Sequence, residues 1–121
     1  MNQANSEEAL RVRAMKADLE SGRSIAWARV DSSELVRRHA AFADQEAECD
    51  MAWARVDSSW SVRWQAVFAD HEEGRDIGWA RGDPDELVRA EAALADRRAG
   101  RDLSWAQDDS SERVREQATY F

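Results

Sequence analysis

Residues 31–56 read DSSELVRRHAAFADQEAECDMAWARV, and residues 57–82 repeat the pattern as DSSWSVRWQAVFADHEEGRDIGWARG. Its clearest marker is a tryptophan that recurs every 26 residues, at Trp27, Trp53, Trp79 and Trp105. A period of 20 to 50 residues is typical of stacked units that bury a core only against their neighbours. The sequence therefore predicts one domain over residues 1–121, built of units at about 5–30, 31–56, 57–82, 83–108 and 109–121.

Each unit is predicted to hold a long helix followed by a short one. Over residues 31–44, Val36, Ala40 and Ala43 recur with helical spacing and form the expected core face. Asp31 is the expected N-cap, with Glu34 as its capping-box partner. A shorter helical turn, of α or 3₁₀ geometry, is expected from residue 50 to about residue 56. Because no stretch alternates in the manner of a strand, the predicted fold class is all-α, a short α-solenoid.

The pattern Ala-x-x-Asp-x-Ser/Pro-x-x-Val-Arg-x-x-Ala at residues 28–40, 54–66 and 80–92 resembles the leucine-rich repeat variant. It is also similar to the broader HEAT-like α-solenoids, which share the Asp followed by a Val-Arg pair. The resemblance covers nearly the whole chain and implies a scaffold that binds proteins or assists an enzyme. Three features depart from the variant: a slightly longer unit, no proline-rich loop, and no cysteine cluster. The iron–sulfur centre of some relatives is therefore not expected here.

Composition and charge exclude several classes of protein. The 17 basic and 25 acidic residues leave a formal charge of −8, so repulsion by phosphates argues against direct binding of nucleic acid. No apolar run approaches the roughly 18 residues of a membrane span, and the polar, acidic N-terminus does not resemble a secretory signal. With Cys49 as the single cysteine, the sequence predicts a cytoplasmic protein without an internal disulfide.

Two recurring residue types are expected to be structural. Arg11, Arg37, Arg63, Arg89 and Arg115 repeat in step with aspartates at 31, 57, 83 and 109, which favours a ladder of ion pairs over a row of anion-binding groups. The same interpretation applies to Arg29, Arg55 and Arg81. The tryptophan row recurs at one offset in every unit, which is typical of a core position rather than of a ligand groove.

Trp60 and Trp64 interrupt the repeat. The other units carry Glu8, Glu34, Glu86 and Glu112 at the first position, and Val12, Arg38, Ala90 and Glu116 at the second. At about 100° per residue, both indoles are expected on the helix face opposite Val62. Because Trp is enriched at binding hot spots, the pair is predicted to contact a partner, surrounded by Glu34, Arg38, Glu86 and Ala90. The alternative is packing against a neighbouring helix of the same array.

No catalytic or metal-binding pattern is present. His39 and His71 fall at different places in the repeat, so no spacing predicts a zinc site. Cys49 lacks the local sequence that accompanies a catalytic cysteine, and no glycine-rich phosphate loop occurs. We therefore expect no enzyme activity, no cofactor and no metal. The acidic loops at residues 45–50 and 71–76 are expected to be solvated edges.

The function expected from the sequence is binding of a protein partner through Trp60 and Trp64. A homodimer through these two residues is one version of that interface. The first alternative is an acidic decoy that occupies the nucleic-acid site of a basic protein, of the phage anti-defence or toxin-neutralising type; the row Glu8, Glu34, Glu86 and Glu112 supports it. The second alternative is an accessory subunit of an enzyme.

Overall fold

The computed structural model describes residues 3–119, with side chains from residue 7 onward, and no strand occurs in this range. The long helices are α1 (Gln3–Glu20), α3 (Glu34–Glu46), α5 (Trp60–Glu72), α6 (Glu86–Arg98) and α8 (Glu112–Thr119). Between them lie the short helices α2 (Ala26–Arg29), α4 (Ala52–Arg55) and α7 (Ser104–Gln107), and the 3₁₀ helix η1 (Gly78–Ala80). The all-α prediction is confirmed, with long and short helices alternating as expected. No helix among these has both the length and the apolar character needed to cross a membrane.

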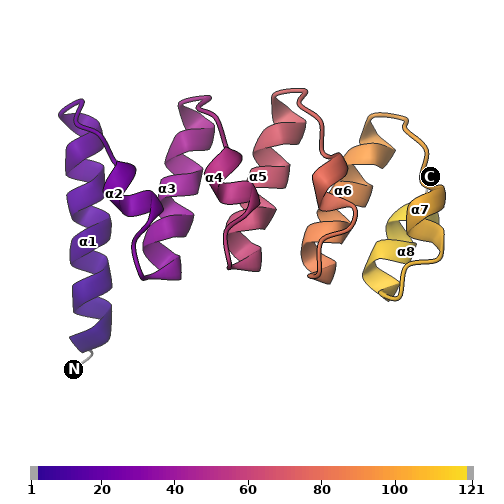
Figure 1. Cartoon of the computed structure of the whole chain (residues 1–121), viewed down its shortest axis with the longest axis horizontal. Helices are drawn as coiled ribbons and strands as arrows, with labels where there is room; N and C mark the ends of the chain where they lie inside the picture. The colour runs from indigo at the N-terminus through magenta and orange to yellow at the C-terminus, as the bar shows by residue number, and fades with distance from the viewer. Residues whose placement is uncertain (1–2, 120–121) are drawn as a thin grey trace.

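The long helices stand side by side in a single row, and the short helices lie against one side of it (Figure 1). We call that side the short-helix face and the opposite side the long-helix face. Four clusters of buried residues fill the spaces between successive units, each combining Val, Met, Ile or Leu with several fully buried alanines. Because alanine side chains are small, neighbouring helices approach closely along the row.

The predicted capping of the long helix is wrong. Helix α3 begins at Glu34 and is capped by Ser33, not by Asp31. The Asp31 carboxylate accepts hydrogen bonds from the Ser33 backbone N–H at 2.8 Å and from the Arg11 guanidinium of the previous unit. The Glu34 carboxylate does not bond to the backbone of its own N-cap residue, because it accepts a hydrogen bond from Ser59 of the next unit. Groups expected to act within one helix therefore link units instead.

The two ends also differ from the simple repeat. Helix α1 runs through Asn5 and Ser6, the register positions at which later units turn into their long helix. Tyr120, which continues the Phe42 and Phe68 register, lies outside the described residues.

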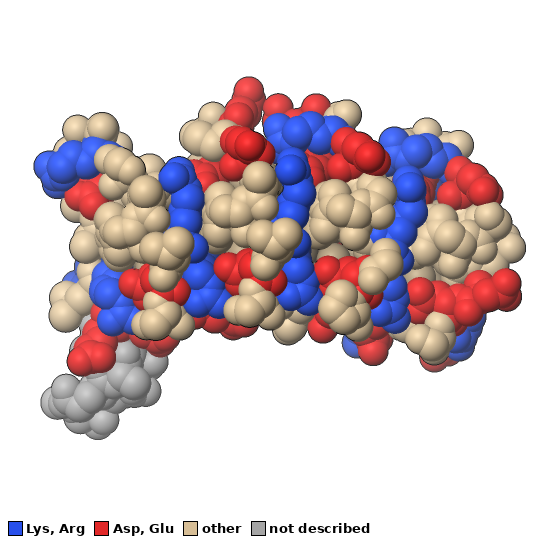
Figure 2. Space-filling view, viewed as in Figure 1, with Lys and Arg blue, Asp and Glu red and all other residues tan. Residues whose placement is uncertain are grey.

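The predicted arginine–aspartate ladder is confirmed. In four consecutive pairs an arginine of one long helix donates to the aspartate 20 residues later, with N···O distances of 2.8–3.0 Å: Arg11–Asp31, Arg37–Asp57, Arg63–Asp83 and Arg89–Asp109. The Nη1 groups of the last three also donate to the main-chain carbonyl of the aspartate six residues earlier. Figure 2 shows the result on the short-helix face, where basic and acidic groups alternate along the lower edge of the row.

A second set of ion pairs centres on a buried aspartate in each of α3, α5 and α6. Asp70 is fully buried, and its carboxylate accepts hydrogen bonds from Arg55 of the preceding short helix at 2.7 and 2.9 Å. It also accepts from the Trp79 indole at 3.0 Å and from Arg75 at 2.8 Å, both of which follow in sequence. The repeated tryptophans thus pack against the core as predicted, but each indole N–H donates to an aspartate: to Asp44, Asp70 or Asp96, which are buried, or to Asp18, which is partly exposed.

The protonation of Asp70 follows from these contacts. Burial alone would raise the pKa of Asp70, but hydrogen bonds from Arg55, Arg75 and Trp79 outweigh burial and hold the pKa below its ordinary value. The pKa of Asp96 is lowered for the same reasons. A carboxylate with a lowered pKa stabilises the fold above its unfolded-state pKa, and this contribution is lost as the pH falls through the folded-state pKa.

We expect Asp70→Asn to lower the free energy of unfolding by about 3–5 kcal/mol at pH 7, because the amide NH₂ would face arginine donors and leave two guanidinium groups without their anion. Urea unfolding followed by circular dichroism measures the difference. It should shrink as the pH falls below about 4, because the unfolded chain then takes up a proton that the folded carboxylate, with its lowered pKa, still resists. Asp50→Asn is the matched control: the side chain is exposed and only 3.9 Å from Arg55 Nη1, so this variant should change stability by less than about 1 kcal/mol.

The loop after each long helix turns through a residue with positive φ. Gly22, Gly74 and Gly100 occupy this position at φ of 76°, 72° and 72°, as expected for a glycine that ends a helix. In the second unit the same position is Glu48, with φ of 58°. A residue with a Cβ atom in this region costs roughly 1–2 kcal/mol relative to glycine.

Glu48→Gly should therefore stabilise the protein, by about 1 kcal/mol or a few degrees in Tm. The reciprocal variant Gly100→Ala should destabilise it by a similar amount, although a Cβ atom at Gly100 meets open space. Thermal unfolding of both variants beside wild type checks the pair. If Glu48→Gly leaves Tm unchanged or lowers it, the left-handed strain assigned to Glu48 is not the controlling effect.

Candidate functional site

The repeat breaks at the boundary between α5 and α6. At three other boundaries a glutamate at the start of a long helix accepts a hydrogen bond from the serine 25 residues later: Glu8–Ser33, Glu34–Ser59 and Glu86–Ser111. Here the two positions hold Trp60 and Asp85, and Asp85 caps α6 through the Leu87 N–H at 2.8 Å. A glutamate at 60 would face the Asp85 carboxylate, so the two departures belong together. Asp85, where other units have Ser33, Ser59 or Ser111, is a second departure from the repeat that is visible in the sequence.

The two tryptophans differ in environment. Trp60 is exposed to 41% and is among the largest apolar side chains open to solvent. Trp64 is only partly exposed and packs against the buried cluster that includes Val67 and Val88. Its ring stacks on Phe68, with centroids 5.8 Å apart and planes inclined by 26°.

The predicted position of Trp64 opposite the core is therefore wrong. A helical wheel assumes one core direction, whereas a long helix inside a row has a neighbour on each side. Trp64 points towards the neighbour α6, where its indole hydrogen-bonds to Glu91.

Shallow hollows surround these residues on the long-helix face. One of about 380 Å³ is lined by Arg38, Trp60, Ser61, Trp64, Gln65 and Leu87. A second of about 200 Å³ lies between Phe42, Gln45, Trp64, Gln65 and Phe68. A third of about 350 Å³ adjoins Leu35, Arg38, His39, Phe42 and Gln65. Gln65 lines all three, so they form one continuous surface over α3 and α5, which we call the aromatic face after Phe42, Trp60, Trp64 and Phe68.

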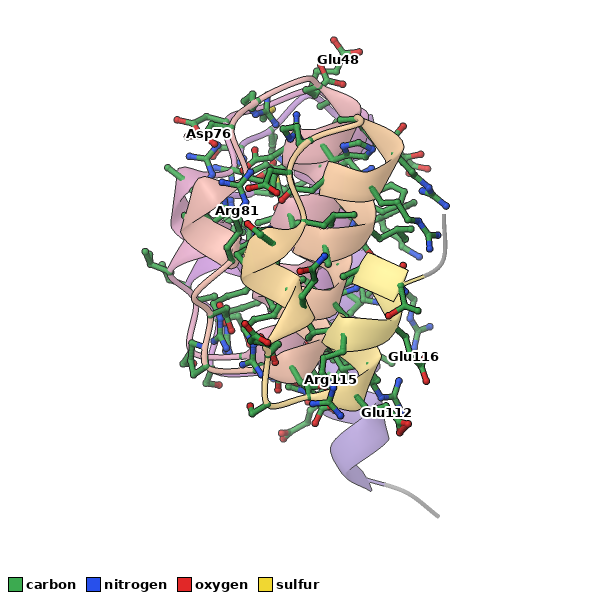
Figure 3. All side chains as sticks on the ribbon, turned by 90° about the vertical axis from the view of Figure 1, so that its right-hand side faces the viewer. Glu48, Asp76, Arg81, Glu112, Arg115 and Glu116 are labelled. Atoms are coloured by element: carbon green, nitrogen blue, oxygen red, sulfur yellow. The ribbon has the colours of Figure 1, made fainter. Side chains whose placement is uncertain are left out.

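Side chains at these register positions point away from the short helices. Figure 3 views the row from its α8 end and labels Glu112 and Glu116, which occupy the registers of Trp60 and Trp64 two units later. Both lie on the side opposite Arg81, which follows the short helix η1. The same two positions in α5 therefore place the tryptophans on the long-helix face.

The predicted surround is only partly assembled. Arg38 lines the hollow beside both tryptophans, and Glu34 lies at its edge through its hydrogen bond with Ser59. Glu86 instead bonds to Ser111 and lies 3.5 Å from Arg113, and Ala90 packs against the cluster around Val114. Glu86 and Ala90 therefore contact the next unit and not the two tryptophans. Leu87, Phe42 and Phe68 belong to the surface and were not predicted, because they follow the repeat and so raised no anomaly.

Two titratable groups border the aromatic face. Burial raises the pKa of Glu91 above its ordinary value, although Arg98 and the Trp64 indole act in the opposite direction. Burial also lowers the pKa of His39, with smaller contributions from Lys16 and Arg38, which favours the neutral imidazole. Each shift favours the uncharged form of its group.

A larger hollow, of about 860 Å³, lies on the short-helix face beside Trp79, Val56 and Pro84. It is open because Gly82 stands where other units have Val30, Val56 or Asp108. Its arginines are engaged by aspartates: Arg63 by Asp83, and Arg55 and Arg75 by Asp70, although Nη2 of Arg75 is buried without a partner. Acidic and basic groups balance within this hollow, so it favours no ligand charge, and the aromatic face is the stronger candidate.

Neither surface contains a metal site. In the described part of the chain, no three His, Cys, Asp or Glu side chains converge so as to hold a metal ion. Comparison with protein-family models, with curated proteins and with solved structures finds no match to this chain.

Glu91→Gln should stabilise the fold at neutral pH. A raised pKa means that the charged form is disfavoured in the folded protein, so wild-type stability falls as the pH rises through this range, and glutamine removes the loss while keeping an acceptor for Trp64. We expect Tm to rise by about 2–4 °C at pH 7 and by almost nothing below about pH 4. The exposed Glu116→Gln is the control. A gain in Tm of equal size at both pH values would contradict the raised pKa assigned to Glu91.

Proposed function

We propose that this protein is a non-catalytic scaffold that binds a protein partner through the aromatic face. The observation that carries the proposal is Trp60, an exposed indole at a position where the other four units have glutamate. A buried core does not require it, and an exposed tryptophan lowers solubility unless something covers it. Phe42, exposed to 51%, lies on the same surface and extends the apolar area beyond one side chain.

The composition of the surface supports protein as the ligand. Aromatic residues and arginine are enriched in the centres of protein interfaces, and Arg38 lies beside both tryptophans. The hollows are shallow and open, and they are lined mainly by apolar atoms with few polar groups that converge. Such a surface suits an extended contact with another folded chain better than it suits a small substrate.

The acidic decoy receives less support. Three glutamates of the row that favoured it, Glu8, Glu34 and Glu86, accept hydrogen bonds from serines of the next unit, and the bond from Ser59 lowers the pKa of Glu34. Exposed carboxylates remain at the loop ends of the row, where Figure 3 labels Glu48 and Asp76. A decoy complex through those loops would weaken steeply with salt, whereas a complex centred on Trp60 would not.

The sharpest test uses the chain's own repeat as a template. Trp60→Glu combined with Asp85→Ser rebuilds the glutamate–serine pair of the other boundaries and removes the exposed indole without opening the core. In quantitative affinity capture from the source organism, we expect proteins bound by wild type to fall about 30-fold or more, the range of a hot-spot loss near 2 kcal/mol. The control Val56→Ser removes an apolar side chain, exposed to 82%, from the opposite face. Equal capture by all three proteins would refute the proposal.

A further inference from the structure

The long-helix face carries opposite charges at its two ends. On the side of α1 and α3, Arg13, Lys16 and Arg38 are exposed and outnumber the exposed Glu34, whose carboxylate accepts a hydrogen bond from Ser59. On the side of α8, Glu112 and Glu116 are exposed, and Figure 3 shows both on this face. Arg113 also lies there, but at 3.5 Å from Glu86 it is balanced within the same chain. The aromatic face separates the basic end from the acidic end.

At the C-terminal ends of the long helices, the order of acidic and basic residues along the row is reversed. Glu20 and Glu46 are exposed at the ends of α1 and α3, whereas Arg98 is exposed at the end of α6. Glu46 and Arg98 differ by 52 residues, which is two repeats, so they occupy the same height on their helices. Arg38 and Glu116 differ by 78 residues, which is three repeats, and share a height as well. The charge thus changes sign along the row at each of two heights.

A surface with this pattern is complementary to itself under a two-fold rotation that exchanges the two ends of the row. Such an axis runs parallel to the long helices and in front of α5 on the long-helix face, so it preserves height. It brings α3 of one copy opposite α6 of the other, and α1 opposite α8. Glu46 then faces Arg98, Phe42 faces Leu94, and Arg13 and Lys16 of α1 face the α8 end that carries Glu116.

Resting on the proposed function, we propose that the protein partner is a second copy of this chain, bound in a two-fold symmetric dimer through the aromatic face. Dimers of this kind use one self-complementary patch on both subunits. Trp60 and Trp64 of the two copies form the apolar centre, and the opposite charges at the two ends form the polar rim. A stable interface needs about 800 Å² from each copy, roughly a ninth of the 7031 Å² surface of the chain.

The decisive experiment is a charge exchange measured by sedimentation equilibrium of the full chain at about 1–200 μM. Wild type is expected to dimerise, and Trp60→Glu with Asp85→Ser is expected to be monomeric. Glu46→Arg alone and Arg98→Glu alone each place like charges opposite one another and should raise the dimer Kd about tenfold. The double variant Glu46→Arg with Arg98→Glu should return towards the wild-type Kd, because each new charge meets its opposite in the other copy.

Two further variants sharpen the test. Glu72 ends α5 near the axis and faces its own mate, so Glu72→Gln should lower the dimer Kd. Val30→Arg adds a charge to the short-helix face, where Val30 is exposed to 81%, and should leave the Kd unchanged. Circular dichroism of each variant separates a lost interface from a lost fold.

Wild type that stays monomeric throughout, or a double variant no better than the single ones, overturns the dimer. If a monomeric wild type still captures another protein in a Trp60-dependent manner, the dimer is wrong and the proposed function stands. If the Trp60 variant changes neither the mass measured in solution nor the capture of other proteins, both the dimer and the proposed function are wrong.

Discussion

The array depends on one buried carboxylate in each of three long helices, α3, α5 and α6. Asp44, Asp70 and Asp96 each bind an arginine from the short helix before them and a tryptophan from the short helix after them. A buried charge without such donors would strongly destabilise the fold, and with them it specifies where both short helices must lie. The buried aspartate therefore fixes the geometry of a unit more sharply than the small alanine-rich core could, because apolar contacts are not directional.

This arrangement places most directional interactions on one side of the row. The arginine–aspartate ladder and the tryptophan–aspartate bonds involve the short-helix face and the seams between units. The outer positions of the long helices make fewer of these bonds, so their identity varies from unit to unit: arginine, histidine, glutamine and glutamate occupy one register at Arg13, His39, Gln65 and Glu91. A surface that the fold does not constrain is the surface on which a binding site can differ from the repeat.

The sequence predicted the repeat and its ion pairs because both follow from residue type and spacing. It did not predict which hydrogen-bond donors each aspartate and glutamate would bind. The Asp31 carboxylate can accept hydrogen bonds from its own unit and from Arg11 of the previous unit. The sequence of one unit does not indicate which of these donors it binds. Trp60 was predicted because it departs from the repeat. Phe42 keeps to the repeat, so it was not predicted, and it becomes part of the surface only because Trp64 and Gln65 lie beside it.

The second unit shows how such departures accumulate beside the candidate site. Where other units have Gly-Arg after the long helix, this one has Glu48 and Cys49. Glu48 adopts a left-handed conformation that glycine would adopt at lower cost, and Cys49 supplies no guanidinium, so Asp44 has one donor fewer than Asp70 or Asp96. The loop between α3 and α4 is therefore held less firmly than its counterparts, and it leads directly from the helix that carries Phe42 and Gln45. Local stability follows the contacts that a segment makes, so this edge of the aromatic face is the one that adjusts to a partner at the smallest cost to the rest of the row.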